Sequence, residues 1–454
     1  MPRTSTSPLL QDAALRAARY LDGLSDRPVA PSPRAVARLD ALDRPLPERP
    51  SAGAEILAEL DDLVSPATMA MAGPRFFGFV IGGALPETVA AGVLATAWDQ
   101  NSARSDVTPG TARVEDVALR WLVDVLGLPP GTAGGFVTGA TVANFTALAA
   151  ARHAVLARAG WDVEEQGLFG APPVTVVVGA EAHVSLLKAL SMLGLGRSRV
   201  TTVPVDGQGR MRAGALPPFA PPAIVCLQAG NVNTGAFDPA AEIVPRAREA
   251  GAWVHVDGAF GLWARAVPSR ALLAAGLEGA DSWATDTHKW LNVPYDSGVA
   301  LVRDEGALRA AMRVTAAYLP QGERRDPADF TPELSRRARG VEVWAALRAL
   351  GRSGVAELVE RTCRQARRFA DGLAAAGHRV LNEVALNQVL VSFGDAERTG
   401  RVIAAVQEDG TCWCGGTVWQ GQSAMRISVS SWATTDEDVE RSLDAIRRAA
   451  SRAT

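Results

Sequence analysis

Lysine is nearly absent from this chain of 454 residues. Lysine and arginine together number 46, yet only Lys188 and Lys289 are lysines. Arginine can replace lysine wherever a positive charge suffices, but its guanidinium stays protonated and cannot attack a carbonyl as a neutral primary amine does. A lysine that persists in such a chain is therefore a candidate nucleophile.

Other scarcities exclude whole classes of protein. Four cysteines in so long a chain argue against a disulfide framework, and no second Cys or His cluster accompanies Cys412 and Cys414, so we expect no metal site. A net charge of −3 gives no reason to expect nucleic acid or an anionic membrane as a partner. No apolar run reaches the roughly 18 residues that span a bilayer. The polar start, residues 1–7, lacks a signal-peptide core, which predicts a cytoplasmic location.

The pattern along the chain predicts three parts: an N-terminal helical segment (residues 1–75), a large α/β domain (76–350) and a small C-terminal α+β domain (351–454). In the middle part, short β-branched runs alternate with Ala/Leu helices, which is typical of a buried parallel sheet covered by helices. The expected strands are Val174–Val178, Ala223–Leu227, Trp253–Val256, Ser282–Ala284 and Val299–Val302.

The two ends of the chain have patterns that differ from that of the middle part. In the last part we expect a helix over Gly354–Ala376, strands near Gln388–Phe393 and Ser423–Ser430, and a last helix that starts at a capping box, Thr434–Glu437. At the N-terminus, the expected helices Ser7–Leu24 and Ala52–Leu63 have apolar stripes that a short segment cannot bury alone. These stripes predict packing on another subunit.

Asp257 and Lys289 each follow a predicted strand, at the edge where ligands bind in parallel sheets. A lysine that holds an aldehyde as an imine and an aspartate that keeps a ring nitrogen protonated are what a pyridoxal 5'-phosphate (PLP) site requires. The sequence therefore predicts PLP as cofactor. Lys188 is interpreted as structural.

Other polar residues fall at the same predicted edge. Thr138–Thr141 precedes a long helix whose first N–H groups can bind phosphate, Thr141 adds a hydroxyl, and His288 can donate to the same phosphate. His183, just after a strand, can stack on a flat cofactor or polarise a departing carboxylate. Asp286 can accept a hydrogen bond from the imine nitrogen or the ring substituents.

These residues resemble those of the PLP-dependent decarboxylases of the aromatic-amino-acid and glutamate decarboxylase group, which share the aspartate aminotransferase-like fold (fold type I). The resemblance covers nearly the whole chain. Its motifs are Phe76-Phe77-Gly78-Phe79, Thr138-Gly139-Ala140-Thr141-Val142-Ala143-Asn144, His183-Val184-Ser185, Gly235-Ala236-Phe237-Asp238, His255-Val256-Asp257, His288-Lys289-Trp290 and Ser335-Arg336-Arg337. The Ser-Trp-x5-Lys-Trp spacing is the specific signal, whereas the glycine-rich turn is common.

The resemblance implies roles for individual residues. Lys289 would be the Schiff-base lysine, Asp257 the partner of the ring nitrogen, and His183 the residue stacked on the ring. Ala140, Thr141 and His288 would surround the phosphate. Asp286 stands where many members have asparagine. Asn231 or Asn233 would replace the paired threonines near the phenolic oxygen, and Gly258 replaces the usual alanine under the ring.

The resemblance also implies a homodimer and a reaction, the decarboxylation of an L-amino acid to an amine. Tyr318 is expected to be the residue that protonates the carbanion. Two alternatives stay open on the same fold: oxidative deamination to an aldehyde, and carbon–carbon lysis. A non-catalytic PLP-binding regulator would need a basic helix-turn-helix segment, which the N-terminus does not supply.

The substrate itself stays open. A group of aromatic residues hints at an apolar pocket: Phe76, Phe77, Phe79 and Trp98. Arg104 or Arg337 could instead meet a side-chain carboxylate.

Overall fold

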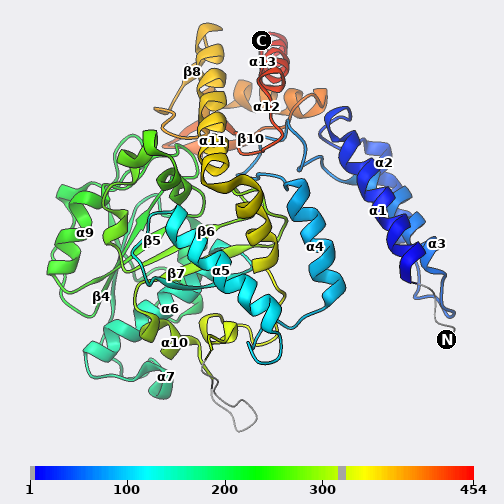
Figure 1. Cartoon of the computed structure of the whole chain (residues 1–454). Helices are drawn as coiled ribbons and strands as arrows, with labels where there is room; N and C mark the ends of the chain where they lie inside the picture. The colour runs from blue at the N-terminus through cyan, green and yellow to red at the C-terminus, as the bar shows by residue number, and fades with distance from the viewer. Residues whose placement is uncertain (1–5, 315–323, 454) are drawn as a thin grey trace.

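The computed structural model describes residues 6–314 and 324–453, which contain two β-sheets (Figure 1). The large sheet has seven strands in the order β1-β7-β6-β5-β4-β2-β3. Its strands are β1 (Ala133–Val137), β2 (Thr175–Gly179), β3 (Thr201–Val203), β4 (Ala223–Gln228), β5 (Trp253–Asp257), β6 (Ser282–Asp286) and β7 (Gly298–Val302). All five predicted strands are present, and β1 and β3 were not predicted.

One strand of this sheet runs against the expected direction. Strands β2, β3, β4, β5 and β6 are mutually parallel, but β7 is antiparallel to both of its neighbours, β6 and β1. Residues 287–297 alone join β6 to β7, and a parallel return needs a crossover of about a dozen residues or more. The sheet is therefore mixed rather than wholly parallel.

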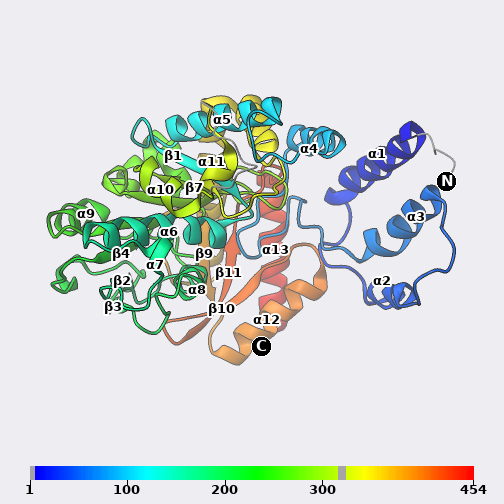
Figure 2. The same ribbon diagram turned by 90° about the horizontal axis from the view of Figure 1, so that it is seen from below.

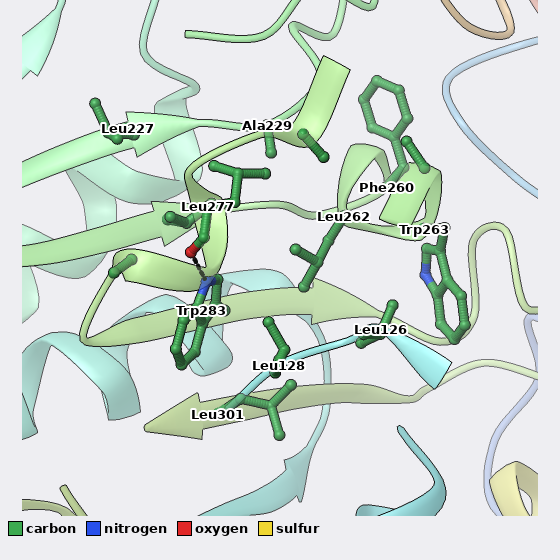
Figure 3. Close-up of a cluster of buried hydrophobic side chains, with 14 of the residues drawn as sticks. Leu126, Leu128, Leu227, Ala229, Phe260, Leu262, Trp263, Leu277, Trp283 and Leu301 are labelled. Atoms are coloured by element: carbon green, nitrogen blue, oxygen red, sulfur yellow. Dashed lines mark hydrogen bonds between the residues drawn. The ribbon is translucent and has the colours of Figure 1, made fainter. Parts of the chain in front are cut away.

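Helices cover both faces of the large sheet. Side chains from α6 (Ala140–Arg158), α8 (Val184–Met192) and α10 (Glu305–Met312) pack on one face, together with Val176 and Val178 of β2. Val177 points to the other face, where α5 (Pro109–Val125), α9 (Ala240–Glu249) and α11 (Gly340–Ala375) pack. Figure 3 shows part of this second core, in which Trp283 Nε1 donates to the Leu277 carbonyl at 2.8 Å. Two covered faces explain the continuous apolar runs of the strands.

The small sheet is antiparallel and lies beside α11, α12 (Ala396–Asp409) and α13 (Asp436–Arg452). Its order is β10-β11-β9-β8, with bounds β8 (Arg379–Val380), β9 (Gln388–Ser392), β10 (Gly415–Trp419) and β11 (Gln422–Ser428). Helix α11 consists of two helical stretches separated by a break at Gly351 (φ 59°). The predicted helix, Gly354–Ala376, corresponds to the second stretch, so α11 begins earlier than predicted. Helix α13 is capped by Thr435 with Asp438, one residue later than the predicted box.

The remaining helices frame these layers. Helices α4 (Pro86–Trp98) and α7 (Val163–Gln166) complete the large part, while α1 (Thr6–Asp22), α2 (Pro33–Ala37) and α3 (Gly53–Glu59) form an N-terminal arm, residues 6–64. Figures 1 and 2 show this arm projecting from the side of the rest of the chain. Among the described helices, none is long and apolar enough to cross a membrane. The division of the chain at residues 75 and 350 stays a prediction.

Candidate active site

The carboxyl ends of the parallel strands bring the predicted site residues to one edge of the large sheet. Asp257 is the last residue of β5, Asp286 is the last residue of β6, and His183 follows β2. Because β5 and β6 are neighbours in the sheet, the two aspartates end adjacent strands. The edge predicted from the sequence is therefore where these side chains gather.

Lys289 lies beside Asp286 at this edge. Its Nζ is 2.8 Å from Asp286 Oδ2, and the Asp286 side chain is only 3% exposed. The other carboxylate oxygen of Asp286 accepts a hydrogen bond from the Ala140 backbone N–H at 2.5 Å, at the start of α6. Asp286 thus joins the predicted lysine to the predicted phosphate-binding helix. Lys188, by contrast, is exposed on α8.

His288 has its ring held in one orientation. Its Nδ1 accepts a hydrogen bond from the Ser297 backbone N–H at 3.0 Å, so in the neutral ring the proton is on Nε2. The Tyr295 ring stacks on the imidazole with centroids 4.2 Å apart. Burial lowers the His288 pKa below its usual value. A neutral His288 therefore presents an N–H donor from Nε2.

Two glycines let the start of α6 approach this edge closely. A Cβ at Gly139 would lie 3.0 Å from His288 Cε1, and a Cβ at Gly298 would lie 2.6 Å from the Gly139 Cα. A side chain at residue 298 would push the helix away from the strands. The glycine-rich turn was a weak sequence signal, and the structure supplies its packing reason.

Asp257 and His183 line a cavity beneath this edge, together with Gly179, Ala182 and Gly209. Burial raises the Asp257 pKa, an effect opposed by the neighbouring His183, by the positive charge of Lys289 and by a hydrogen bond from Asn144. Burial likewise lowers the His183 pKa. A buried carboxylate needs a cation or several donors to offset its desolvation, and a protonated ring nitrogen is such a cation.

The two candidate asparagines have different surroundings. Asn231 Oδ1 accepts hydrogen bonds from the backbone N–H groups of Asn233 and Thr234, at 2.8 and 3.2 Å. Its Nδ2 is buried and has no hydrogen-bond partner within the described part of the chain. Asn233 Oδ1 accepts from Thr417 Oγ1 at 3.0 Å. Of the two, Asn231 is the one whose side-chain donor is buried without a partner among the described residues.

Arg426 on β11 lies close enough to His183 for its charge to lower the His183 pKa, and sequence reasoning did not single it out. Burial lowers its pKa, and its Nη1 donates to the Val232 carbonyl at 3.3 Å. Within residues 6–314 and 324–453, no carboxylate lies within ion-pair distance of it. No local signal could have singled it out, because arginine is abundant here and β11 belongs to the small sheet.

The residues considered for substrate binding separate into two groups. Phe76 and Phe77 are buried in hydrophobic clusters, whereas Phe79 is 58% exposed and stacks on Trp413, and Trp98 is 49% exposed. Arg104 is paired with Asp106 and Arg337 with Glu342, so neither arginine is free of a carboxylate. Tyr318 lies outside the described residues.

The residues present fit PLP. The buried donor Asn231 Nδ2 has no described partner, the Gly139–Gly298 contact brings helix N–H groups to the edge, and Lys289 supplies an amine. Asp257 offers a buried carboxylate to a protonated ring nitrogen.

Comparison with known proteins agrees with this chemistry. Residues 33–394 match the pyridoxal-dependent decarboxylase conserved domain. The chain is 30% identical to L-2,4-diaminobutyrate decarboxylase of Rhizobium meliloti, over 90% of this chain and 84% of that protein. It is 32% identical to an acidic amino acid decarboxylase of Mus musculus, over 66% of this chain but 56% of that protein. The crystal structure of Oryza sativa TDC with PLP and tryptamine superposes with a TM-score of 0.90 at 22% identity, covering 100% of this chain and 99% of that one.

The chain therefore belongs to the pyridoxal-dependent decarboxylase family. The predictions of the family, of fold type I, of PLP and of a PLP-dependent decarboxylase are confirmed. The match spans little more than half of the mouse relative's length.

Proposed function

We propose that this protein removes the α-carboxylate of an L-amino acid as CO2 and releases the amine. The observation that carries the proposal is the pair of groups at adjacent strand ends: the amine of Lys289, one of only two lysines in the chain, and the buried carboxylate of Asp257. When bound, PLP supplies a carbonyl for the amine and a ring that accepts the electron pair that departing CO2 leaves behind.

Each residue would contribute a separate interaction. Lys289 Nζ would hold the cofactor and give way to the substrate amine. Asp257 would keep a proton on the ring nitrogen, His183 would cover the ring, and Asn231 Nδ2 would donate toward it. His288 Nε2–H, Thr141 and the α6 N-terminus would bind the phosphate, an anion that helix N-termini favour.

Arg426 would bind a substrate carboxylate. A guanidinium that loses water on burial needs an anion, and within the described ranges it has only one carbonyl as a hydrogen-bond partner. The pairing of Arg104 and Arg337 with Asp106 and Glu342 argues against either of them as an open site for an acidic side chain.

Product analysis tests the reaction. Purified protein with PLP is incubated with each of the twenty amino acids, and amine, CO2, aldehyde, ammonia and peroxide are measured. Amine with equal CO2 supports the proposal. Aldehyde with ammonia and peroxide would replace it with the oxidative alternative, and new carbon–carbon cleavage products would replace it with lysis.

A homodimer is proposed from the N-terminal arm. Helix α1 has no buried residue, and the arm exposes apolar side chains that include Leu10, Leu15 and Leu46 at 51, 64 and 90%. Light scattering should give twice the chain mass, and Leu15→Glu should shift the protein toward monomer, whereas Leu272→Glu, a 90% exposed leucine elsewhere, should not. An active monomeric wild type would contradict the proposal. A cytoplasmic location stays a prediction.

A further inference from the structure

A line of hydrogen-bonded polar side chains runs behind Asp257, away from the cavity. Trp253 Nε1 lies 2.9 Å from Ser282 Oγ, which lies 2.9 Å from His255 Nδ1. His255 Nε2 lies 2.9 Å from Asn144 Oδ1, and Asn144 Nδ2 lies 3.1 Å from Asp257 Oδ2. None of the five residues is more than 4% exposed. The line crosses β5, β6 and α6, so it forms only when these elements pack together.

The direction of every hydrogen bond in this line follows from its ends. The Trp253 indole can only donate, so the Ser282 oxygen accepts from it. Within residues 6–314 and 324–453, the only other partner of Ser282 Oγ is His255 Nδ1, and a buried hydroxyl hydrogen is costly to leave without an acceptor, so this hydrogen turns to His255 Nδ1. His255 then carries its proton on Nε2 and donates to Asn144 Oδ1. From the other end, an ionised Asp257 can only accept, so Asn144 presents Nδ2 to it and keeps Oδ1 for His255. The Trp253 end favours the same tautomer that the Asp257 end requires.

His255 takes part as a neutral ring. Its burial lowers its pKa to about 3, so it does not become a cation at neutral pH. A cation at this place would attract Asp257 and compete with the ring nitrogen for the carboxylate. A neutral donor orders the line without adding that competitor.

We propose that Ser282, His255 and Asn144 are positioning residues that hold Asp257 as an oriented, ionised acceptor for the cofactor ring. A reversed Asn144 amide would turn its oxygen toward the carboxylate, and the His255 Nε2–H prevents that reversal because it has to meet an oxygen. The role of the line in the reaction rests on the proposed function, whereas its direction rests on the geometry alone.

Kinetics of matched variants test the role. Asn144→Ala should lower kcat by about 10- to 100-fold, the loss expected for one hydrogen bond to a charged group, with KM changed less than about threefold. Thr146→Ala is the control, since Thr146 is equally buried on α6 but donates to Val142 within the helix. Ser282→Ala should have a smaller effect in the same direction, and Ser282→Thr, which keeps the hydroxyl, should restore kcat. Equal losses in Asn144→Ala and Thr146→Ala, or a loss confined to KM, would overturn the role.

Histidine-selective 15N NMR of the full chain, with and without PLP, tests the line independently of activity. The chain has five histidines, and His255→Gln assigns the signal. We expect the Nε2–H tautomer with no titration between about pH 5.5 and 8. An Nδ1–H tautomer, or titration near the ordinary histidine pKa, would overturn the proposed direction. If no amino acid is decarboxylated but the tautomer is as expected, the proposed function fails while the line stands.

Discussion

The two ends of the candidate site hold their charges in different ways. At one end, Lys289 and Asp286 form a direct ion pair at 2.8 Å, and the lysine side chain is 20% exposed. At the other end, Asp257 is 4% exposed and has Asn144, a neutral amide, as its side-chain donor. The amine has to leave its partner for the reaction to proceed, whereas the carboxylate has to stay in place.

This difference matches what each charge costs. An isolated carboxylate in a dry site is strongly destabilised, and only a cation or several donors can offset that cost. Asp257 accepts hydrogen bonds from neutral protein groups, so its negative charge stays available to pair with a protonated ring nitrogen. Lys289 forms an ion pair with Asp286, so the charge of its ammonium group is compensated within the protein.

The largest effect is expected at the lysine end. Lys289→Arg should lower activity by at least about 10³-fold, the scale of removing an enzyme's nucleophile, because the charge near Asp286 is kept and the reactive amine is lost. Borohydride reduction followed by peptide mapping should label Lys289 in the wild type and no residue in the variant. A label on Lys188 would show that the assignment is wrong.

The next effect concerns Tyr318, which lies outside the described residues. Tyr318→Phe should slow amine release by about 10²–10⁴-fold, the usual range for a positioned general acid. It should also divert part of the flux to aldehyde, ammonia and peroxide in the presence of oxygen. Tyr295→Phe is the comparison, because Tyr295 stacks on His288 and its ring is kept. Unchanged amine release without peroxide would leave His183 or water as the donor.

At the carboxylate end, Asp257→Asn should keep PLP bound to Lys289 but lower kcat by about 10- to 100-fold, the effect of one to two pKa units at the ring nitrogen. Absorbance of the bound cofactor checks occupancy, and steady-state assays check kcat. Activity within about twofold of the wild type would mean that the ring need not be protonated and that the two ends differ less than we argue.

The smallest effect is on stability. Because burial lowers the His255 pKa to about 3, the unfolded chain binds one more proton between that pKa and the ordinary value near 6.5. The contribution of His255 to the free energy of unfolding is therefore fully present above about pH 6.5. It is lost as pH falls below that value, by up to about 1.4 kcal/mol per pH unit. Urea unfolding at pH 7.5 and 5.5 should show this loss, and His255→Gln should reduce it. His183 and His288, whose pKa values are also lowered, add a loss of the same sign. An unchanged pH dependence in His255→Gln would contradict a buried neutral His255.

Sequence reasoning succeeded where chemistry and periodicity are local. The five strands, the edge that carries Asp257 and Lys289, and the family were all predicted correctly. It missed β3 and β8, which are only three and two residues long, and β1 and β10, in which two adjacent glycines weaken the strand pattern. It placed the capping box one residue early because Thr434 and Thr435 offer the same cap chemistry.

The sequence by itself determined which chemistry the chain can carry, because a nucleophilic amine and a ring-nitrogen partner require particular residue types in a particular order. Only the tertiary structure decided which neighbours complete the site. Arg426, Asn144 and the free Nδ2 of Asn231 come from elements far apart in the chain, and their burial and hydrogen bonds exist only once those elements pack. The antiparallel turn of β7 was decided in the same way, by how far an 11-residue link, residues 287–297, can reach across a sheet.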